Sequence, residues 1–246
     1  MFVDAWKPVF NRPANVQPPD WDSFEFKYKD YLKPLIGIRD DNFDAHELAA
    51  QAARFNRGAV GGLDGWTPAE QKSLPLGAWE DRVHVEKLIA SGGKYPDVYY
   101  QVPIPMLRKG EGRTPKEHRG LSIFVTNYRL SSGVWWTRIQ KPMKTWIHKA
   151  SVGGIADHES IETAFDAQLS MEQAMLDRKE YTQINTDYEK FFDTFDPKFF
   201  HKFLIAIGVP RVAADLISHV YYDTAANKNR KTRWQSFQQQ QRLRTR

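Results

Sequence analysis

The segment from Ile184 to Asp193 constrains the fold more than any other part of the chain. Its composition predicts a short strand that ends on Asp187, followed by a turn with two adjacent phenylalanines and a second acid, Asp193. Apolar residues at helical spacing precede this segment, and Asp196 with Pro197 supplies an N-cap and a first helical residue after it. Helix, strand and helix in this order predict an α/β (α+β) fold.

The carboxylate of Asp187 is the first candidate for chemistry. A carboxylate at the end of a strand can point into a cleft and hold a hard cation such as Mg²⁺ through oxygen. An aspartate at such a position also serves as a turn or helix-cap residue, and Asp193 fits a cap or an ion pair equally well. The segment alone leaves both interpretations open.

Helices are predicted along most of the remaining chain. Capping boxes are indicated at Asp44 with Glu47 and at Thr67 with Glu70. Apolar spacing predicts helices over 44–55, 76–91, 134–147 with a kink at Pro142, 157 or 160 to 179, 197–207 and 212–222. The side chains expected to face inward include Trp79, Val83 and Leu88 in one helix and Ile161, Phe165, Leu169 and Leu176 in another.

The chain carries a net charge of +5, and its basic residues gather in two places. One cluster lies around a glycine-containing loop between two predicted strands, 102–107 and 121–125, which together predict a basic β-hairpin. The other lies in residues 228–246. Such clusters favour phosphate backbones or acidic partners, and a solvated basic surface is the alternative. The first cluster comprises Arg108, Lys109, Arg113, Lys116, Arg119 and Arg129.

Composition excludes several classes of site. The chain has no cysteine, so disulfides, thiolate zinc sites and cysteine catalysis are excluded. No apolar run is long enough to span a membrane, and the first residues lack the apolar core of a signal peptide. An intracellular location, in the nucleus or cytoplasm and away from membranes, is therefore expected. The oligomeric state is left open.

A family resemblance rests on six short motifs within residues 40–222. They occur in the same order as in the family. The series resembles the N-terminal half of a reverse transcriptase of the non-LTR retrotransposon and group II intron type. In that family the corresponding motifs are a Gly-x-Asp-Gly loop, a lysine–glycine turn, an Arg-Pro-Ile-Ser segment, a tyrosine–arginine pair, a glycine loop and a strand-end aspartate before Phe-Asp. The motifs here are Gly62–Trp66, Lys109–Gly110, Arg119–Ile123, Asn127–Leu130, Ser151–Gly154 and Asp187–Asp193.

The resemblance implies helix-rich fingers with a basic β-hairpin, followed by the first strand and helices of a polymerase palm, in an incomplete domain. It implies fingers over 41–150 and a partial palm over 151–226. The Pro- and aromatic-rich composition of residues 1–40 predicts an extended arm, and the basic, Gln-rich composition of residues 227–246 predicts a disordered tail. The implied activity is RNA-directed DNA synthesis by metal-dependent nucleotidyl transfer. Mg²⁺ or Mn²⁺ would be the cofactor, and an RNA template, a DNA primer and deoxynucleoside triphosphates would be the partners.

Residue roles follow from the same resemblance. Asp187 resembles the first catalytic aspartate, a ligand to both metal ions, and the backbone carbonyl of Tyr188 would bind the metal on the nucleotide side. Phe192 resembles the aromatic residue under the incoming sugar, with core packing as the alternative. Arg119, with Lys109 as second choice, resembles the cation that grips the triphosphate, with a solvent-exposed hairpin charge as the alternative.

The resemblance also indicates contacts with the nucleic-acid strands. Asp64 and Gly65 would set a loop near the template, with an ordinary turn as the alternative. Arg108, Arg113 and Lys116 of the hairpin are expected to contact the phosphate backbone.

The chain departs from the family pattern at several positions. Gly120 stands where proline is usual, Phe191 replaces a small residue, and Asn185 and Thr186 make the strand before Asp187 more polar. The later Tyr-x-Asp-Asp turn, which supplies the remaining metal ligands, is missing, so the chain is expected to be inactive alone. The alternatives are a non-catalytic nucleic-acid-binding module and an unrelated structural helical domain.

Overall fold

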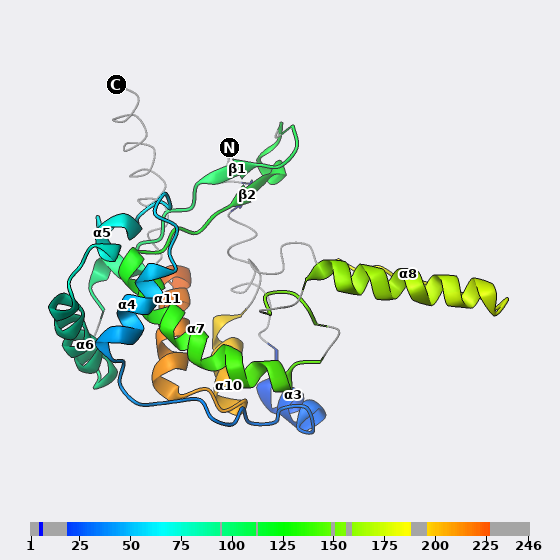
Figure 1. Cartoon of the computed structure of the whole chain (residues 1–246), viewed down its shortest axis with the longest axis horizontal. Coiled ribbons are helices and arrows are strands. Elements are labelled where there is room, and N and C mark those ends of the chain that lie inside the picture. The colour runs from blue at the N-terminus through cyan, green and yellow to red at the C-terminus, as the bar shows by residue number, and fades with distance from the viewer. Residues whose placement is uncertain are drawn as a thin grey trace.

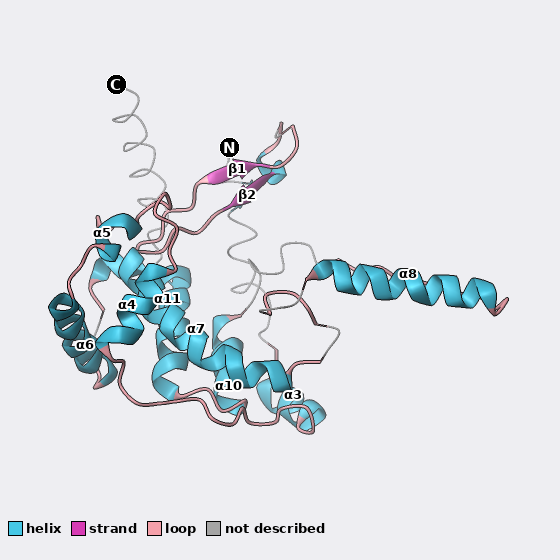
Figure 2. Cartoon of the chain, viewed as in Figure 1, coloured by secondary structure: helices cyan, strands magenta, loops and turns pink. Residues whose placement is uncertain are grey.

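The computed structural model describes residues 5–6, 19–93, 95–111, 113–148, 151–155, 159–187 and 196–226. Helices dominate this part of the chain, and its sheet has two antiparallel strands (Figures 1 and 2). The helix-rich, mixed character predicted from the sequence is confirmed at this coarse level. The elements are α3 (Trp21–Tyr28), α4 (Ala45–Ala53), α5 (Pro68–Lys72), α6 (Leu76–Ala90), η1 (Asp97–Tyr100), β1 (Met106–Arg108), η2 (Pro115–Glu117), β2 (His118–Gly120), α7 (Thr126–Trp146), α8 (Ser160–Leu176), α10 (Pro197–Ala206) and α11 (Arg211–Ala226).

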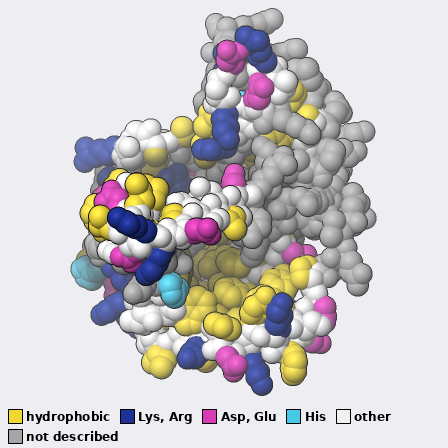
Figure 3. Space-filling model, turned by 90° about the vertical axis from the view of Figure 1, so that its right-hand side faces the viewer, with side chains coloured by type: hydrophobic (Ala, Val, Ile, Leu, Met, Phe, Trp, Pro, Cys, Tyr) yellow, Lys and Arg dark blue, Asp and Glu magenta, His cyan; other side chains and the backbone are white. Residues whose placement is uncertain are grey.

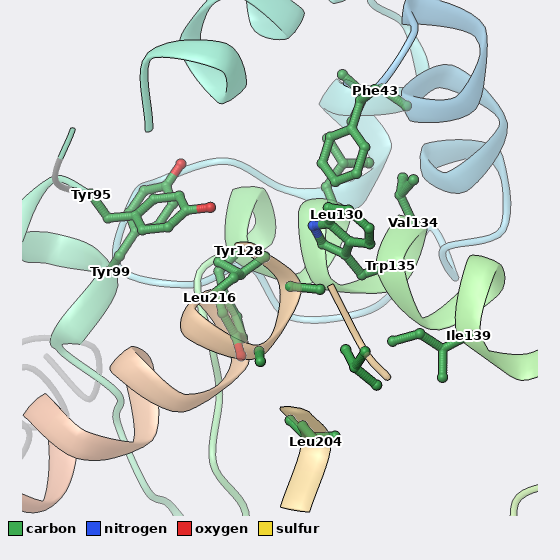
Figure 4. Packing of buried hydrophobic residues seen from close by; sticks show 14 of the residues in the cluster. Phe43, Tyr95, Tyr99, Tyr128, Leu130, Val134, Trp135, Ile139, Leu204 and Leu216 are labelled. Atoms are coloured by element: carbon green, nitrogen blue, oxygen red, sulfur yellow. The ribbon is translucent and has the colours of Figure 1, made fainter. Parts of the chain in front are cut away.

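Helix α7 forms the centre of the core (Figure 1). It packs against α4 and α11, while α4 also packs on α6 and α10 packs on α11. Its side chains Leu130, Val134, Trp135 and Ile139 are buried, and the ring of Phe43 lies 5.3 Å from that of Trp135 (Figure 4). Complete burial of one such apolar side chain stabilises the fold by about 1.5–3 kcal/mol. The core cluster has members in all five of these helices, so it holds them together.

The predicted helix starts are confirmed where a local side chain caps the helix. Capping boxes begin α4 at Asp44 and α5 at Thr67, and the Asp196 carboxylate accepts hydrogen bonds from two backbone N–H groups at the start of α10. Helix α7 differs from its prediction: it begins at Thr126, eight residues before Val134, and runs through Pro142. Its first turns are mostly polar and lack an apolar stripe, so the spacing of apolar residues does not predict that they are helical.

The β-hairpin is confirmed, but both strands are displaced from their predicted positions. Backbone bonds from Leu121 to Pro105 and from Ile123 to Pro103, each 3.0 Å, continue the same pairing register beyond the assigned strands. Pro103 and Pro105 have no N–H and cannot return these bonds, so the ladder is complete only from Met106 onward.

The expectation of an extended arm over residues 1–40 is wrong for Trp21–Tyr28, which form helix α3. Asp20 caps this helix by accepting a hydrogen bond from the backbone of Ser23. Trp21 and Phe24 lie in ring contact with Phe199 of α10, so this helix packs its aromatic rings against α10. The local cap outweighs the aromatic-rich composition that favoured an extended chain.

Helix α8 forms as predicted, but the predicted burial of its apolar side chains is wrong. It projects from the rest of the molecule in Figure 1 and points toward the viewer in Figure 3, and none of its residues is buried. Leu88 of α6 was also expected inside and is 67% exposed, while Trp79 and Val83 of the same helix are buried. Periodicity identifies the apolar stripe of a helix without identifying a partner for it. The stripe of α8 consists of Ile161, Phe165, Leu169 and Leu176, all exposed.

The predicted strand before Asp187 is not present. Residues 181–187 form no regular secondary structure, and Ile184 is 81% exposed. The two strands within the described residues pair with each other, so this segment has no neighbouring strand to supply hydrogen bonds. Its polar side chains bond locally instead, as Gln183 Nε2 does with Asn185 Oδ1 at 3.0 Å.

Candidate nucleic-acid interface

The hairpin brings two of the predicted nucleotide-binding cations onto one face. Arg119 is paired with Leu107, and the N–H of Lys109 donates to the carbonyl of Glu117 at 2.8 Å, which extends the same register. Side chains alternate between the two faces of a strand, so Lys109 and Arg119 are diagonal neighbours on one face. Both side chains are exposed.

The other hairpin cations are divided between the second face and the tip. Arg108 is paired with His118 and lies on the face opposite Arg119. Arg113 lies at the tip, where it forms an exposed ion pair of 2.5 Å with Glu111. Lys116 lies in η2. The hairpin is therefore basic on both faces, and Arg113 is partly neutralised by its own neighbour.

Local hydrogen bonds fix the end of the hairpin that carries these cations. The Glu117 carboxylate accepts from the backbone N–H groups of Arg113 and Thr114, at 2.6 and 3.0 Å. The indole N–H of Trp6, a side chain only 2% exposed, donates to the carbonyl of Pro115 at 3.0 Å. These contacts tie the tip to its own strand and to the N-terminal segment, which limits the conformations of the basic loop.

Gly120 has a clear packing role in this hairpin. A Cβ atom added there would lie 3.0 Å from the side chain of Ile104 and close to Met106. Both side chains lie on the same face as Gly120, by the alternation along each strand. Glycine at this position therefore leaves room for the side chains of Ile104 and Met106 on this face of the hairpin.

Asp64 and Gly65 occupy a structural position. The Asp64 carboxylate accepts hydrogen bonds from the backbone N–H and side-chain amide of Asn127, at 3.3 and 3.2 Å. Val125, the residue before α7, offers no side-chain cap, so Asp64 provides the cap from a distant loop. Gly65 has a φ of 77°, a left-handed conformation that favours glycine in the turn. These contacts favour the turn interpretation that the sequence left open.

A buried polar cluster behind this loop was not predicted. The Glu86 carboxylate accepts from the Ser131 hydroxyl at 2.6 Å and pairs with Arg82 at 2.5 Å. Burial raises the pKa of Tyr95 and Tyr99, and the Glu86 carboxylate raises both further. Burial alone would lower the pKa of Arg82, but the carboxylate beside it raises the value overall. Arg82 and Glu86 stand at i,i+4 spacing on a predicted helix, and this spacing is the feature of the cluster that the sequence shows.

Asp187 is the one residue of the Asp187–Asp193 motif that the structure describes. Asp187 is exposed, and within the described ranges no group of three or more His, Cys, Asp or Glu side chains could hold a metal ion. One carboxylate is a poor donor set for Mg²⁺, which prefers six oxygen ligands. Tyr188, Phe192 and Asp193 lie outside the described residues, as does the basic tail 227–246. No metal-dependent step is assigned to this segment.

Among the described residues, no helix combines the length and apolar character needed to cross a membrane. The chain matches no protein-family model and no curated protein. The function proposed below therefore rests on the residues of this chain and on their geometry.

Proposed function

We propose that the chain is a reverse-transcriptase-like fragment that binds nucleic-acid backbone through its basic hairpin. The observation that carries this proposal is the placement of Lys109 and Arg119 as exposed diagonal neighbours on one face. In the part of the chain that the structure describes, neither side chain forms an ion pair. Both charges are therefore available to a phosphate.

The chemistry of this face suits a nucleic-acid strand. The arginine fork can bind a phosphate through two hydrogen bonds, while the lysine ammonium acts as a mobile point charge. Leu107 and Leu121 lie on the same face and are 50% and 48% exposed, which offers apolar contact to sugars beside the charges. Affinity supplied by phosphate contacts depends little on base sequence and falls steeply with salt.

The proposed parent activity is RNA-directed DNA synthesis, and the order of the six motifs supports it. We expect this chain to be inactive by itself, because its sequence carries no Tyr-x-Asp-Asp turn to supply the remaining metal ligands. We expect primer extension by the purified chain with Mg²⁺ or Mn²⁺ to stay at background. Extension that disappears in Asp187→Ala would contradict this expectation and would place catalysis at that carboxylate.

The hairpin is tested by fluorescence anisotropy with labelled RNA, DNA and RNA–DNA hybrid across a salt series. The slope of log affinity against log salt is negative, and each lost phosphate contact reduces its magnitude by about 0.7–0.9. Lys109→Ala/Arg119→Ala should therefore make the slope less steep by roughly 1.5. A matched control, Lys33→Ala/Lys87→Ala, removes two exposed lysines elsewhere and the same net charge.

Two results would overturn the proposal. If the intact chain binds none of the three nucleic acids at low salt, the structural-domain alternative becomes the better account. If the control variant flattens the slope as much as the hairpin variant does, binding reflects net charge and the hairpin has no special part in it.

A further inference from the structure

A cavity of about 960 Å³ lies on a part of the molecule that nucleic-acid binding does not use. Its walls come from the segment before α4, from the end of α6 through η1, from α7 and from the start of α11. Figure 4 shows Tyr95 on one side of the Leu216 region and Phe43 with Trp135 on the other. A volume of this size is typical of small-molecule sites.

The floor of the cavity is apolar and aromatic. Phe43, Tyr95, Trp135 and Leu216 line it, and each is less than 9% exposed. These side chains come from four different segments, so the floor exists only in the folded chain. A ligand with a hydrocarbon stem would gain apolar contact here.

The charged residues that line the cavity are acidic, although the whole chain is basic. The lining includes five carboxylates and none of its residues is Lys, Arg or His. Asp41 is paired with Arg39, Glu86 with Arg82 and Asp215 with His201. Asp40 and Asp97 are exposed, and neither forms an ion pair with any residue that the structure describes. They leave two uncompensated negative charges on different walls.

The separation of these carboxylates decides between two kinds of cation. Within the described residues no three acidic or histidine side chains could hold one metal ion, so the carboxylates are too dispersed for a compact divalent cation. An elongated cation can instead meet dispersed carboxylates with separate charges and lay its alkyl segments on the aromatic floor. We infer that the cavity binds an alkyl polyammonium ligand, a small polyamine.

Isothermal titration calorimetry with spermidine as the probe, at physiological salt, tests this inference. Spermidine should bind with one-to-one stoichiometry and more tightly than n-butylamine, which has one charge. Asp40→Asn/Asp97→Asn keeps the shape of the lining and should weaken spermidine binding roughly threefold to tenfold, as expected for two exposed ion pairs. The matched control Asp30→Asn/Asp166→Asn removes two exposed carboxylates elsewhere and should leave the affinity unchanged.

Several results would overturn the inference. The inference fails if spermidine does not bind. It also fails if Asp30→Asn/Asp166→Asn weakens spermidine binding as much as Asp40→Asn/Asp97→Asn does, because that result would indicate a general effect of net charge. Displacement of spermidine by an equal concentration of Mg²⁺ would assign the cavity to a metal ion. Tighter binding of a lysine-containing peptide than of spermidine would assign it to a protein partner. Near-ultraviolet circular dichroism of each variant confirms that the fold is retained, so a loss of binding can be attributed to the charge.

Discussion

At the scale of single residues, Asp64 belongs to a motif that the sequence allows to be interpreted in two ways. The glycine-rich loop around it predicts a turn, and the family resemblance predicts a contact near the template strand. Two hydrogen bonds to Asn127 make it the cap of α7, the helix at the centre of the core. The sequence indicates that Asp64 has a role in this loop, but it does not indicate its partner Asn127, which lies 63 positions away.

Replacement of Asp64 by alanine separates these roles. Asp64→Ala should lower the free energy of unfolding by about 1–3 kcal/mol, because it leaves the polar groups of Asn127 unpaired at a partly buried site. Urea denaturation measures this change, and Asp30→Ala, at an exposed turn, serves as the control. The nucleic-acid affinity of the folded variant should equal that of the parent chain. A loss of affinity without a loss of stability would favour the template-contact role.

At the scale of elements, local caps and turns are predictable, whereas contacts between distant elements are not. The capping boxes of α4 and α5 lie within four consecutive residues each and were predicted from the sequence. The anchor between α4 and α7 is Arg138, which pairs with Glu47 at 2.5 Å and donates to the carbonyls of residues 39, 41 and 42. No periodicity marks this arginine, because its partners lie about ninety positions earlier.

Arg138 should therefore be one of the most sensitive polar positions in the chain. Its side chain is 5% exposed and lies over the rings of Phe43 and Trp135. Arg138→Ala should cost about 3–5 kcal/mol of stability, because it breaks a largely buried ion pair and removes packing from the core. Thermal unfolding followed by circular dichroism measures the effect. Arg54→Ala, at an exposed arginine with one hydrogen bond to Thr137, should change stability by no more than about 0.5 kcal/mol.

At the scale of the whole molecule, the sequence predicts the order of the helices well and their assembly less well. The core of α4, α6, α7, α10 and α11 uses most of the predicted stripes. The apolar stripe of α8 has the same spacing but lies exposed, with Phe165 at 60% and Leu176 at 80%. An apolar stripe indicates that a helix can bury one face. Whether it does so depends on a complementary surface, which only the folded chain provides.

This difference yields a direct comparison of two apolar side chains. Leu204 of α10 is 7% exposed and belongs to the core cluster, so Leu204→Ala should destabilise the chain by about 2–5 kcal/mol through the cavity that it leaves. Phe165→Ala on α8 deletes a larger side chain, yet it should change the free energy of unfolding by no more than about 0.5 kcal/mol. Urea denaturation at low protein concentration measures both variants. A cost for Phe165→Ala comparable to that for Leu204→Ala would mean that α8 packs against the core in solution, because an apolar side chain contributes to stability only where folding removes it from water.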